Sequence, residues 1–287
     1  MNALSGHTQP FAVLGHPIGH SLSPVMHNAS LRALGRDAIY LAFDVAPDQL
    51  MTVLPAMRAM GFAGVNLTVP LKEVAHAGLT DLDDSARLVG AVNTVAFPAS
   101  GSMRGYNTDG YGFLTAMQEA FGPSIKDEVI HVIGTGGAGR AVALVAARNG
   151  ARGISCADVD EARATKVARE IEEAAPGCAV TVVPVAAQAT AVRAADVVIQ
   201  STPVGMRPED PPLLSAAAFR SGQKVFDLIY MFPETAIMRE ARAAGAATAN
   251  GLSMLLHQGA RAYTIWTGET PDVAAMRTAL EKAVYGP

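Results

Sequence analysis

The stretch VIHVIGTGGAGRA, residues 129 to 141, constrains the fold more than any other part of this chain. Its first five residues are apolar and typical of a strand, and the alanine-rich residues at its end are typical of a helix. Between them, Gly134, Gly136 and Gly139 have the G-x-G-x-x-G spacing of a dinucleotide-binding turn. In such a turn the first glycine permits a tight bend. The second lets backbone N–H groups approach a pyrophosphate, and the third lets the helix pack on the strand.

The residues on either side of the turn favour a nucleotide site over a plain connection between a strand and a helix. A helix that begins near Ala138 would offer unpaired N–H groups and the positive end of its dipole to phosphates. The next strand-like run, residues 153–157, ends directly before Asp158, which is where a ribose-binding carboxylate is expected. We therefore predict a Rossmann-like nucleotide-binding domain.

Composition and charge exclude several other classes of protein. The chain has 287 residues, enough for two domains, and its 50% hydrophobic and 17% charged residues are typical of an α/β enzyme. A net charge of −4 gives no reason to expect nucleic acid or an anionic membrane as a partner. No apolar run approaches the roughly 20 residues of a membrane span, and the N-terminus lacks a secretory pattern, so we expect a cytoplasmic protein.

No metal site is expected from the sequence. The two cysteines, Cys156 and Cys178, do not have the spacing of metal ligands and are interpreted as small buried side chains. The histidines His16, His20, His27 and His257 also lack such spacing, and we interpret them as structural or as side chains that support the site residues.

The alternation of strand-like and helix-like runs predicts an α/β protein of two domains. We expect a substrate domain over residues 1–108 with a mostly parallel sheet, a nucleotide-binding domain over 109–250, and C-terminal helices over 251–287 that return to the first domain. The strands expected in the first domain are 11–15, 38–44 and 62–67, with a hairpin of 91–97 and 102–105. Those expected in the second are 129–133, 153–157, 180–184, 196–200 and 224–228.

Polar side chains in the first domain gather at the expected ends of strands, where ligands bind in α/β sheets. They are Ser21, Ser23, Asn66, Thr68, Lys72, Asn93, Thr94, Asn107 and Asp109. A lysine and a carboxylate in one cleft form an acid–base pair for a substrate hydroxyl. Each residue also has a plainer interpretation: Ser23 as the N-cap of a helix, Lys72 as a solvated residue in a first turn, and Asp109 as another N-cap.

Eight motifs occur in the order seen in shikimate and quinate/shikimate dehydrogenases, so nearly the whole chain resembles that family. The motifs are HSLSP at 20–24, NLTVPLK at 66–72, GAVNT at 90–94, GYNTDG at 105–110, GTGGAGRA at 134–141, STPVGM at 201–206, DLIYMFPETAIM at 227–238 and NGLSMLLHQ at 250–258.

The resemblance implies a role for each matching residue. Lys72 would be the acid–base residue beside Asp109, and closure of the two domains would exclude water. Ser21 and Ser23 would bind the substrate carboxylate, and Thr68, Asn93 and Asp109 would hydrogen-bond its ring hydroxyls. Tyr230 would reach the substrate from the second domain, and Gln258 from the closing helix. The residues expected at the cofactor are Asp84, Gly134, Thr135, Gly136, Gly137, Ala138, Asp158, Thr202, Leu228 and Gly251.

The expected cofactor is NAD, with NADP less favoured. Members of the family that use NADP carry an Asn-Arg-Thr run after the second strand of the nucleotide domain, whereas this chain has Asp158, Val159 and Asp160. A carboxylate accepts hydrogen bonds from the free hydroxyls of the NAD ribose and repels the 2′-phosphate of NADP. Arg163 lies nearby in the sequence and would compensate in part.

The function implied is an oxidoreductase that interconverts shikimate and 3-dehydroshikimate by hydride transfer to NAD. Action on quinate and 3-dehydroquinate stays open, because the Ser-Leu-Ser run at 21–23 is usual for shikimate enzymes while other segments look more like quinate/shikimate members. Alternatives are an NADP-dependent biosynthetic enzyme, a dehydrogenase of a related ring substrate, and a non-catalytic sensor of shikimate or quinate. The expected partner is a small molecule, and a homodimer is left open.

Overall fold

The computed structural model describes residues 4–122 and 125–286. It divides the chain into two compact units. The first unit comprises Met1–Gly112 and Leu255–Pro287, and the second comprises Phe113–Met254. The boundaries fall within two helices, α5 (Asp109–Phe121) and α10 (Leu252–Thr267). The last two helices, α10 from Leu255 onward and α11 (Val273–Tyr285), therefore belong to the same unit as the N-terminal strands.

The first unit contains a mixed sheet of six strands in the order β2-β1-β3-β5-β6-β4. The strand β1 is parallel to both of its neighbours, β2 and β3. The strand β5 is antiparallel to both of its neighbours, β3 and β6. The expected strands and hairpin are confirmed. The two-residue strand β4 was not predicted, because so short a segment has no periodicity. The bounds are β1 Gln9–Gly15, β2 Ala38–Asp44, β3 Gly64–Leu67, β4 Asp81–Leu82, β5 Thr94–Ala96 and β6 Arg104–Tyr106.

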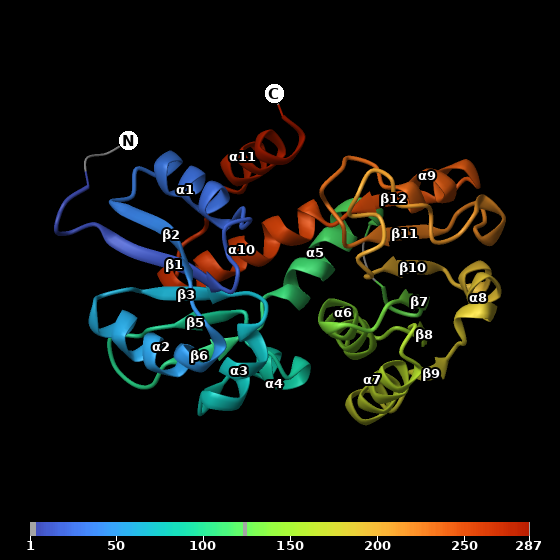
Figure 1. The fold of residues 1–287 in the computed structure, drawn as a ribbon, viewed down its shortest axis with the longest axis horizontal. Helices are drawn as coiled ribbons and strands as arrows, with labels where there is room; N and C mark the ends of the chain where they lie inside the picture. Colours follow the sequence, from blue (N-terminus) through green and yellow to red (C-terminus); the bar gives the residue numbers. More distant parts are fainter. Residues whose placement is uncertain (1–3, 123–124, 287) are drawn as a thin grey trace. The chain divides into compact units, whose positions relative to one another are not determined.

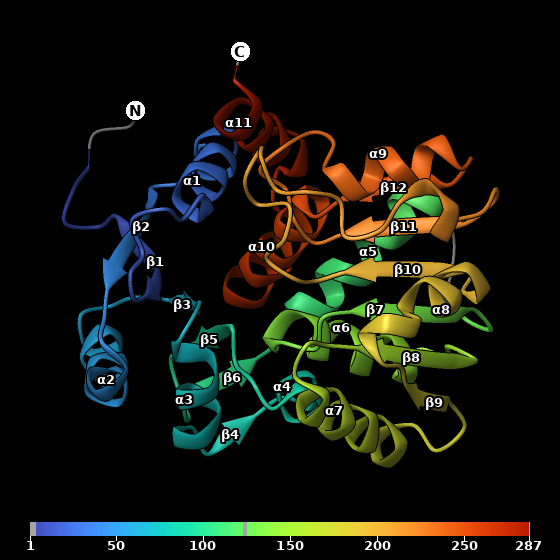
Figure 2. The same cartoon turned by 45° about the vertical axis from the view of Figure 1, so that its right-hand side comes forward.

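Alternating side chains of β1 enter two different cores. Ala12 and Leu14 pack in the larger apolar cluster, whereas Phe11 and Val13 pack on the other face with Tyr263 of α10. On that face α1 and α11 lie side by side (Figures 1 and 2). The helices of this unit, besides α10 and α11, are α1 Ser23–Ala33, α2 Leu50–Ala59 after the short helix Pro47–Gln49, α3 Leu71–Gly78 and α4 Asp84–Val89.

The second unit contains a six-stranded sheet, and every pair of neighbouring strands is parallel. Figure 1 shows its strands in the order β12-β11-β10-β7-β8-β9. From β7 the chain adds β8 and then β9 on one side. It then crosses to the other side of β7, where β10, β11 and β12 follow. This reversal is the switch point at which doubly wound sheets bind nucleotides.

The five strands expected in this unit are confirmed, and a sixth, β12, was not predicted. Its sequence, ATAN, has one β-branched side chain, Thr248, and no large apolar side chain of the kind that signals a buried strand. The strands are β7 Val129–Ile133, β8 Gly153–Ala157, β9 Ala179–Val182, β10 Val197–Gln200, β11 Lys224–Asp227 and β12 Ala247–Asn250. The helices, besides α5 and the start of α10, are α6 Gly137–Arg148, α7 Glu161–Ala174, α8 Gln188–Ala194 and α9 Ala236–Ala243, with short 3-10 turns at Val185–Ala187 and Ala216–Ala218.

No helix in the described ranges is long and apolar enough to cross a membrane.

Candidate active site

Lys72 and Asp109 form an ion pair within the first unit. Lys72 Nζ lies 2.7 Å from Asp109 Oδ2, and both side chains are partly buried, with 28% and 17% of their surfaces exposed. Lys72 is the second residue of α3, and Asp109 is the first residue of α5. The structure thus brings the expected pair together, and neither residue is a solvated surface side chain.

The sheet explains why residues from distant parts of the chain meet here. Because β1 and β3 are parallel and β5 is antiparallel to β3 and β6, the carboxyl ends of β1, β3 and β6 share one edge with the start of β5. Thr68 and Lys72 follow β3, Asn93 precedes β5, and Asp109 follows β6. The point between β1 and β3 is also where the chain reverses direction across the sheet, the place at which α/β sheets bind ligands.

Asn93 connects the ion pair to a buried network. Its Nδ2 donates to Asp109 Oδ1 at 2.7 Å and lies 3.4 Å from Gln258 Oε1. Its Oδ1 accepts from the backbone N–H of Thr108 at 2.8 Å, which fixes the orientation of the amide. Asn93 and Gln258, two expected substrate residues, therefore lie beside the ion pair. Thr108 is part of the same network and only 1% exposed.

The interpretation of Ser23 as an N-cap is wrong. The N-cap of α1 is Leu22, and no side chain caps this end. Ser23 is the first helical residue, and its N–H donates to Ser21 Oγ at 3.3 Å. The two serines thus lie together after β1. Thr68, at the end of β3, lies against the same loop, because a Cβ placed on Gly15 would be 2.6 Å from Thr68 Cγ2.

Asp109 is not an N-cap either. Its own N–H is accepted by Asn107 Oδ1 at 3.1 Å, so Asn107 satisfies this end of α5. Both carboxylate oxygens of Asp109 remain directed at side chains, Oδ2 at Lys72 and Oδ1 at Asn93.

In the second unit, the glycine turn has the shape that a dinucleotide needs. Gly134 has a φ of +87°, a conformation that other residues rarely adopt. A Cβ on Gly139 would lie 2.1 Å from the carbonyl oxygen of Gly134, so α6 approaches the end of β7 too closely for any side chain. At Gly136 and Gly137 a Cβ would meet nothing within 4 Å, which leaves open space beside the N-terminus of α6. Ala138, also at this N-terminus, is exposed. These residues fit a bound pyrophosphate.

Asp158 lies at the end of β8, with only 5% of its side chain exposed. Its Oδ2 accepts from Thr135 N and Thr135 Oγ1 at 2.7 and 2.9 Å, and its Oδ1 accepts from Asp160 N at 2.9 Å. Burial alone would raise the pKa of this carboxyl. The hydrogen bonds from Asp160 and Thr135, with the charge of Arg163, nevertheless hold the pKa below its usual value. Thr135 therefore supports Asp158, and the carboxylate is ionised.

The other residues expected at the cofactor fall into two groups. Thr202 follows β10 and contacts the turn, because a Cβ on Gly134 would lie 2.7 Å from Thr202 Cγ2. Gly251 packs against Leu228, whose carbonyl oxygen lies 2.1 Å from a Cβ placed on Gly251. The structure thus brings Thr202 to the turn, and Leu228 and Gly251 to each other.

Asp84 and Tyr230 each belong to a different unit from the residues that they are expected to join. Asp84 is an exposed residue of α4 in the first unit, paired with Arg87 at 2.8 Å. Tyr230 belongs to the second unit, where burial raises the pKa of its phenol. The roles expected for both residues stay predictions.

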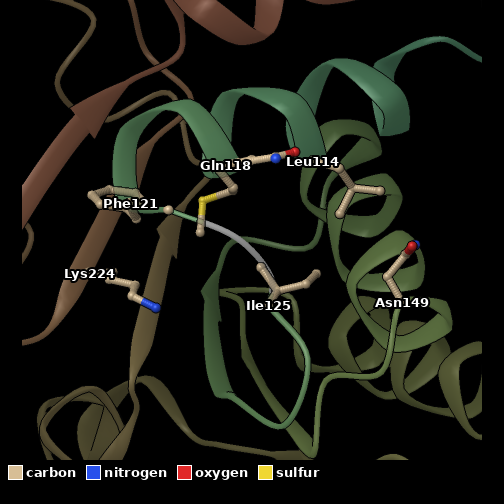
Figure 3. A pocket seen from close by; sticks show the side chains of 8 residues that line it. Leu114, Gln118, Phe121, Ile125, Asn149 and Lys224 are labelled. Atoms are coloured by element: carbon tan, nitrogen blue, oxygen red, sulfur yellow. The ribbon is translucent and has the colours of Figure 1, made fainter.

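A cavity of about 170 Å³ in the second unit is separate from the nucleotide turn (Figure 3). It lies among Leu114, Gln118 and Phe121 of α5, Ile125, Asn149 and Lys224. Lys224 begins β11 and Asn149 follows α6, so the cavity is at the amino ends of the strands, opposite the edge that carries the glycine turn. Lys224 Nζ is also paired with Glu128 Oε1 at 2.7 Å.

Within the described residues, no three His, Cys, Asp or Glu side chains are grouped as metal ligands.

Comparison with known proteins decides the family. Residues 13–95 match the model of the shikimate dehydrogenase substrate binding domain, residues 251–281 match that of the shikimate 5'-dehydrogenase C-terminal domain, and residues 129–221 match that of coenzyme F420-dependent NADP oxidoreductases. The shikimate dehydrogenase (NADP(+)) of Methanothermobacter thermautotrophicus is 39% identical over 98% of this chain and 99% of its own length. The chain belongs to the shikimate dehydrogenase family. As a member it is a nicotinamide-dependent oxidoreductase.

Solved structures of this family have the same fold over the full length. Shikimate 5-dehydrogenase from Listeria monocytogenes, in complex with shikimate and NAD, has a TM-score of 0.90 and 34% identity, covering 98% of this chain and 99% of its own. Quinate dehydrogenase from Corynebacterium glutamicum, in complex with NAD, has a TM-score of 0.87 and 34% identity, covering 95% and 98%. The expected α/β architecture, with a substrate-binding and a Rossmann-like part, is thereby confirmed.

Proposed function

We propose that this dehydrogenase interconverts shikimate and 3-dehydroshikimate, with Lys72 as the acid–base residue. The observation that carries the proposal is the 2.7 Å contact between Lys72 Nζ and Asp109 Oδ2 in a cluster of hydrogen-bonding side chains. A polyhydroxylated ring needs many fixed donors and acceptors. Asn93, Gln258 and Thr68 supply them at the edge of the sheet where the ion pair lies.

Each end of the substrate is assigned to its own residues. The carboxylate binds Ser21 and Ser23 after β1, and the reacting hydroxyl lies at Lys72 and Asp109. During reduction Lys72 donates a proton to the carbonyl oxygen as it becomes a hydroxyl, and during oxidation it takes that proton back. Asp109 orients the Lys72 amine and accepts from the substrate hydroxyl. When bound, the nicotinamide cofactor exchanges a hydride with the ring carbon. The glycine turn at residues 134–139, with Thr202, would hold its pyrophosphate.

NAD is proposed as the preferred cofactor, although the Methanothermobacter relative is named for NADP(+). A carboxylate has about four acceptor positions, and three of those of Asp158 are used by Thr135 and Asp160, so one remains for a ribose hydroxyl. Arg163, the cation nearest to Asp158, is already shared between Asp158 at 3.6 Å and Asp160 at 3.3 Å. Val159 is 94% exposed and supplies no charge. A 2′-phosphate here would meet two carboxylates and one engaged guanidinium.

Initial rates with four substrate pairs test the proposal: shikimate or quinate, each with NAD or NADP. We expect shikimate with NAD to give the highest kcat/KM. Faster turnover with NADP would contradict the assignment of Asp158 while leaving the acid–base pair intact. A preference for quinate would move the protein to the activity named for its Corynebacterium neighbour. No turnover of either acid would refute the proposed reaction. The cytoplasmic location and the homodimer stay predictions.

A further inference from the structure

Tyr40 is the one residue of the edge strand β2 whose side chain is buried. Its exposed fraction is 1%, whereas Leu41 and Phe43 beside it are 38% and 39% exposed. The strand therefore inserts a single large side chain into the interior, and that side chain carries a hydroxyl group. Burying a hydroxyl without partners is unfavourable, so its contacts indicate what it is there to hold.

The phenol has two polar partners, and both lead to the active site. Its O–H donates to Asn66 Oδ1 at 2.7 Å. Ser23, assigned above to the substrate carboxylate, hydrogen-bonds to the same phenol. Because the phenol hydrogen is given to Asn66, Ser23 donates to the phenol oxygen. Burial raises the pKa of Tyr40 well above its usual value, so the phenol keeps the hydrogen that it donates.

Neighbouring groups fix Tyr40 in place. The side-chain amide of Asn28 pairs with the backbone of Tyr40 in both directions, at 2.8 and 2.9 Å. The ring of His27 stacks on the phenol ring with 4.2 Å between centroids and 3° between planes. His27 is itself buried and its pKa is lowered to about 3 by burial, so the stacked ring is neutral. A side chain held in this way has one position for its hydroxyl.

A directed chain of hydrogen bonds runs from Asn66 to Asp109. Asn66 Nδ2 donates to Thr94 Oγ1 at 3.0 Å, and Thr94 Oγ1 donates to Asn93 Oδ1 at 2.9 Å. Asn93 Nδ2 then donates to Asp109 Oδ1 at 2.7 Å. Every donor in the chain points toward the carboxylate. The hydrogen of Tyr40 therefore orients the Asn66 amide together with the Asn93 carbonyl oxygen, which accepts from Asn66 Nδ2 at 3.1 Å, and the Asn93 amide is oriented jointly by Thr94 and the N–H of Thr108.

We propose that Tyr40 is a positioning residue that holds both ends of the substrate site, Ser23 at the carboxylate end and the Asn93–Asp109 pair at the acid–base end. The proposal rests on the roles given to those residues under the proposed function. A substrate carboxylate is a stronger acceptor than a neutral phenol oxygen, so Ser23 transfers its hydrogen bond from Tyr40 to the carboxylate on binding. Until then the phenol keeps the serine hydroxyl in one orientation.

The replacement Tyr40→Phe removes the hydroxyl and keeps the ring that stacks on His27. It leaves Ser23 free to rotate and Asn66 Oδ1 without its donor. We expect KM for shikimate to rise and kcat to fall, for a combined loss in kcat/KM of about tenfold or more. The Kd for NAD alone should stay within about twofold, because the nucleotide turn lies in the second unit.

A matched control is Tyr263→Phe. Tyr263 is also a 1% exposed tyrosine of the first unit, and its hydroxyl interacts with Thr267 of its own helix and not with a residue assigned to the substrate. The control should keep kcat and KM within about twofold of the wild type. The two variants differ in what the lost hydroxyl contacts and not in the size of the change.

A double-mutant cycle separates the two ends of the site. In a Ser23→Ala background, Tyr40→Phe should no longer raise KM and should still lower kcat, because the kcat effect runs through Asn66. If Tyr40→Phe matches the wild type in both constants, or if it lowers Tm and weakens NAD as much as shikimate, Tyr40 is not a positioning residue. Wild-type turnover of shikimate is measured first. Its absence would refute the proposed function and this inference together, whereas a silent Tyr40→Phe refutes only the inference.

Discussion

Lys72 Nζ and Asp109 Oδ2 lie 2.7 Å apart although 37 positions separate the two residues in the chain. The contact is held from both sides. The carbonyl oxygen of Lys72 accepts from the N–H of Val92 at 2.9 Å, which ties α3 to the segment before β5. Asn93, the next residue, holds the other carboxylate oxygen of Asp109. The backbone that positions the lysine therefore also positions the amide that orients its partner.

Replacing Lys72 by alanine should reduce turnover far more than substrate binding. Loss of a positioned acid–base group typically lowers kcat by about 10² to 10⁴-fold. The carboxylate of shikimate would still bind Ser21 and Ser23, so its Kd, measured by calorimetry, should change by less than about tenfold. Lys166→Ala is a suitable control, since that side chain is 74% exposed in the second unit. A Lys72→Ala enzyme with near-normal turnover would remove lysine from the mechanism.

The cofactor preference should respond to the end of β8. In the double variant Asp158→Asn with Val159→Arg, a repelling carboxylate becomes a neutral amide and a guanidinium becomes available for the 2′-phosphate. We expect the ratio of kcat/KM for NADP to that for NAD to rise by about 10- to 100-fold. Arg163→Ala in the wild-type background shows whether the existing arginine already contributes. An unchanged ratio in the double variant would place the discrimination elsewhere in the site.

Local patterns in the sequence predicted most of the strands, because apolar periodicity and glycine turns are local signals. They failed where the signal was short or atypical, as at β4 and β12. The Ser-Pro pair at residues 23–24 indicated an N-cap, yet Ser23 lies one residue inside the helix. The N–H of Ser23 is instead accepted by Ser21 Oγ. A single residue of offset therefore removes the capping role and places Ser23 beside Ser21, where we propose that the substrate carboxylate binds.

The pairing inside the active site depends on contacts that no local pattern encodes. Spacing alone left Lys72 and Asp109 as two residues with plain alternatives, and the resemblance to a family was needed to join them. Thr108 lies in the GYNTDG motif, but no pattern in the sequence indicated a role of its own. Tyr40 lies in an apolar run, AIYLAFD, where a tyrosine is a common strand residue. Their roles follow from partners that are distant in the sequence.

Replacing Gly139 by alanine should lower the stability of the protein, whereas replacing Gly137 by alanine should weaken the binding of NAD. At Gly139 the new methyl group would lie 2.1 Å from the Gly134 carbonyl, so we expect a loss of roughly 2 kcal/mol or more in stability. At Gly137 there is open space, so the variant should fold normally and its Kd for NAD should rise about tenfold as the methyl enters the expected phosphate site.

Thermal melts and fluorescence titrations with NAD distinguish these effects. Gly177→Ala serves as the control, because a Cβ at that position meets nothing within 4 Å and Gly177 is remote in the sequence from the turn. Wild-type NAD affinity in Gly137→Ala would show that the open space is not where the pyrophosphate binds.

Asp227 should make the second unit less stable as the pH rises from 4 to 7. This carboxyl is fully buried at the end of β11, where Thr235 Oγ1 donates to it at 2.6 Å and Ile229 N at 3.0 Å. Burial raises its pKa from 3.8 to about 6 in spite of these two hydrogen bonds. Between the two pKa values, 3.8 in the unfolded state and about 6 in the folded state, the folded state holds a proton that the unfolded state has released. The free energy of unfolding therefore falls with increasing pH.

Asp227→Asn removes this dependence, because an amide does not titrate. Its oxygen still accepts from Ile229 N, and its NH₂ group can donate to Thr235 Oγ1. A shift of about two pH units corresponds to roughly 3 kcal/mol. The stability of the variant relative to the wild type should therefore rise by about that amount from pH 4 to pH 7. Urea unfolding is followed by circular dichroism, since the single tryptophan, Trp266, belongs to the first unit. If the free energy of unfolding changes with pH in the same way for both proteins across this range, Asp227 is already ionised in the folded state at pH 4.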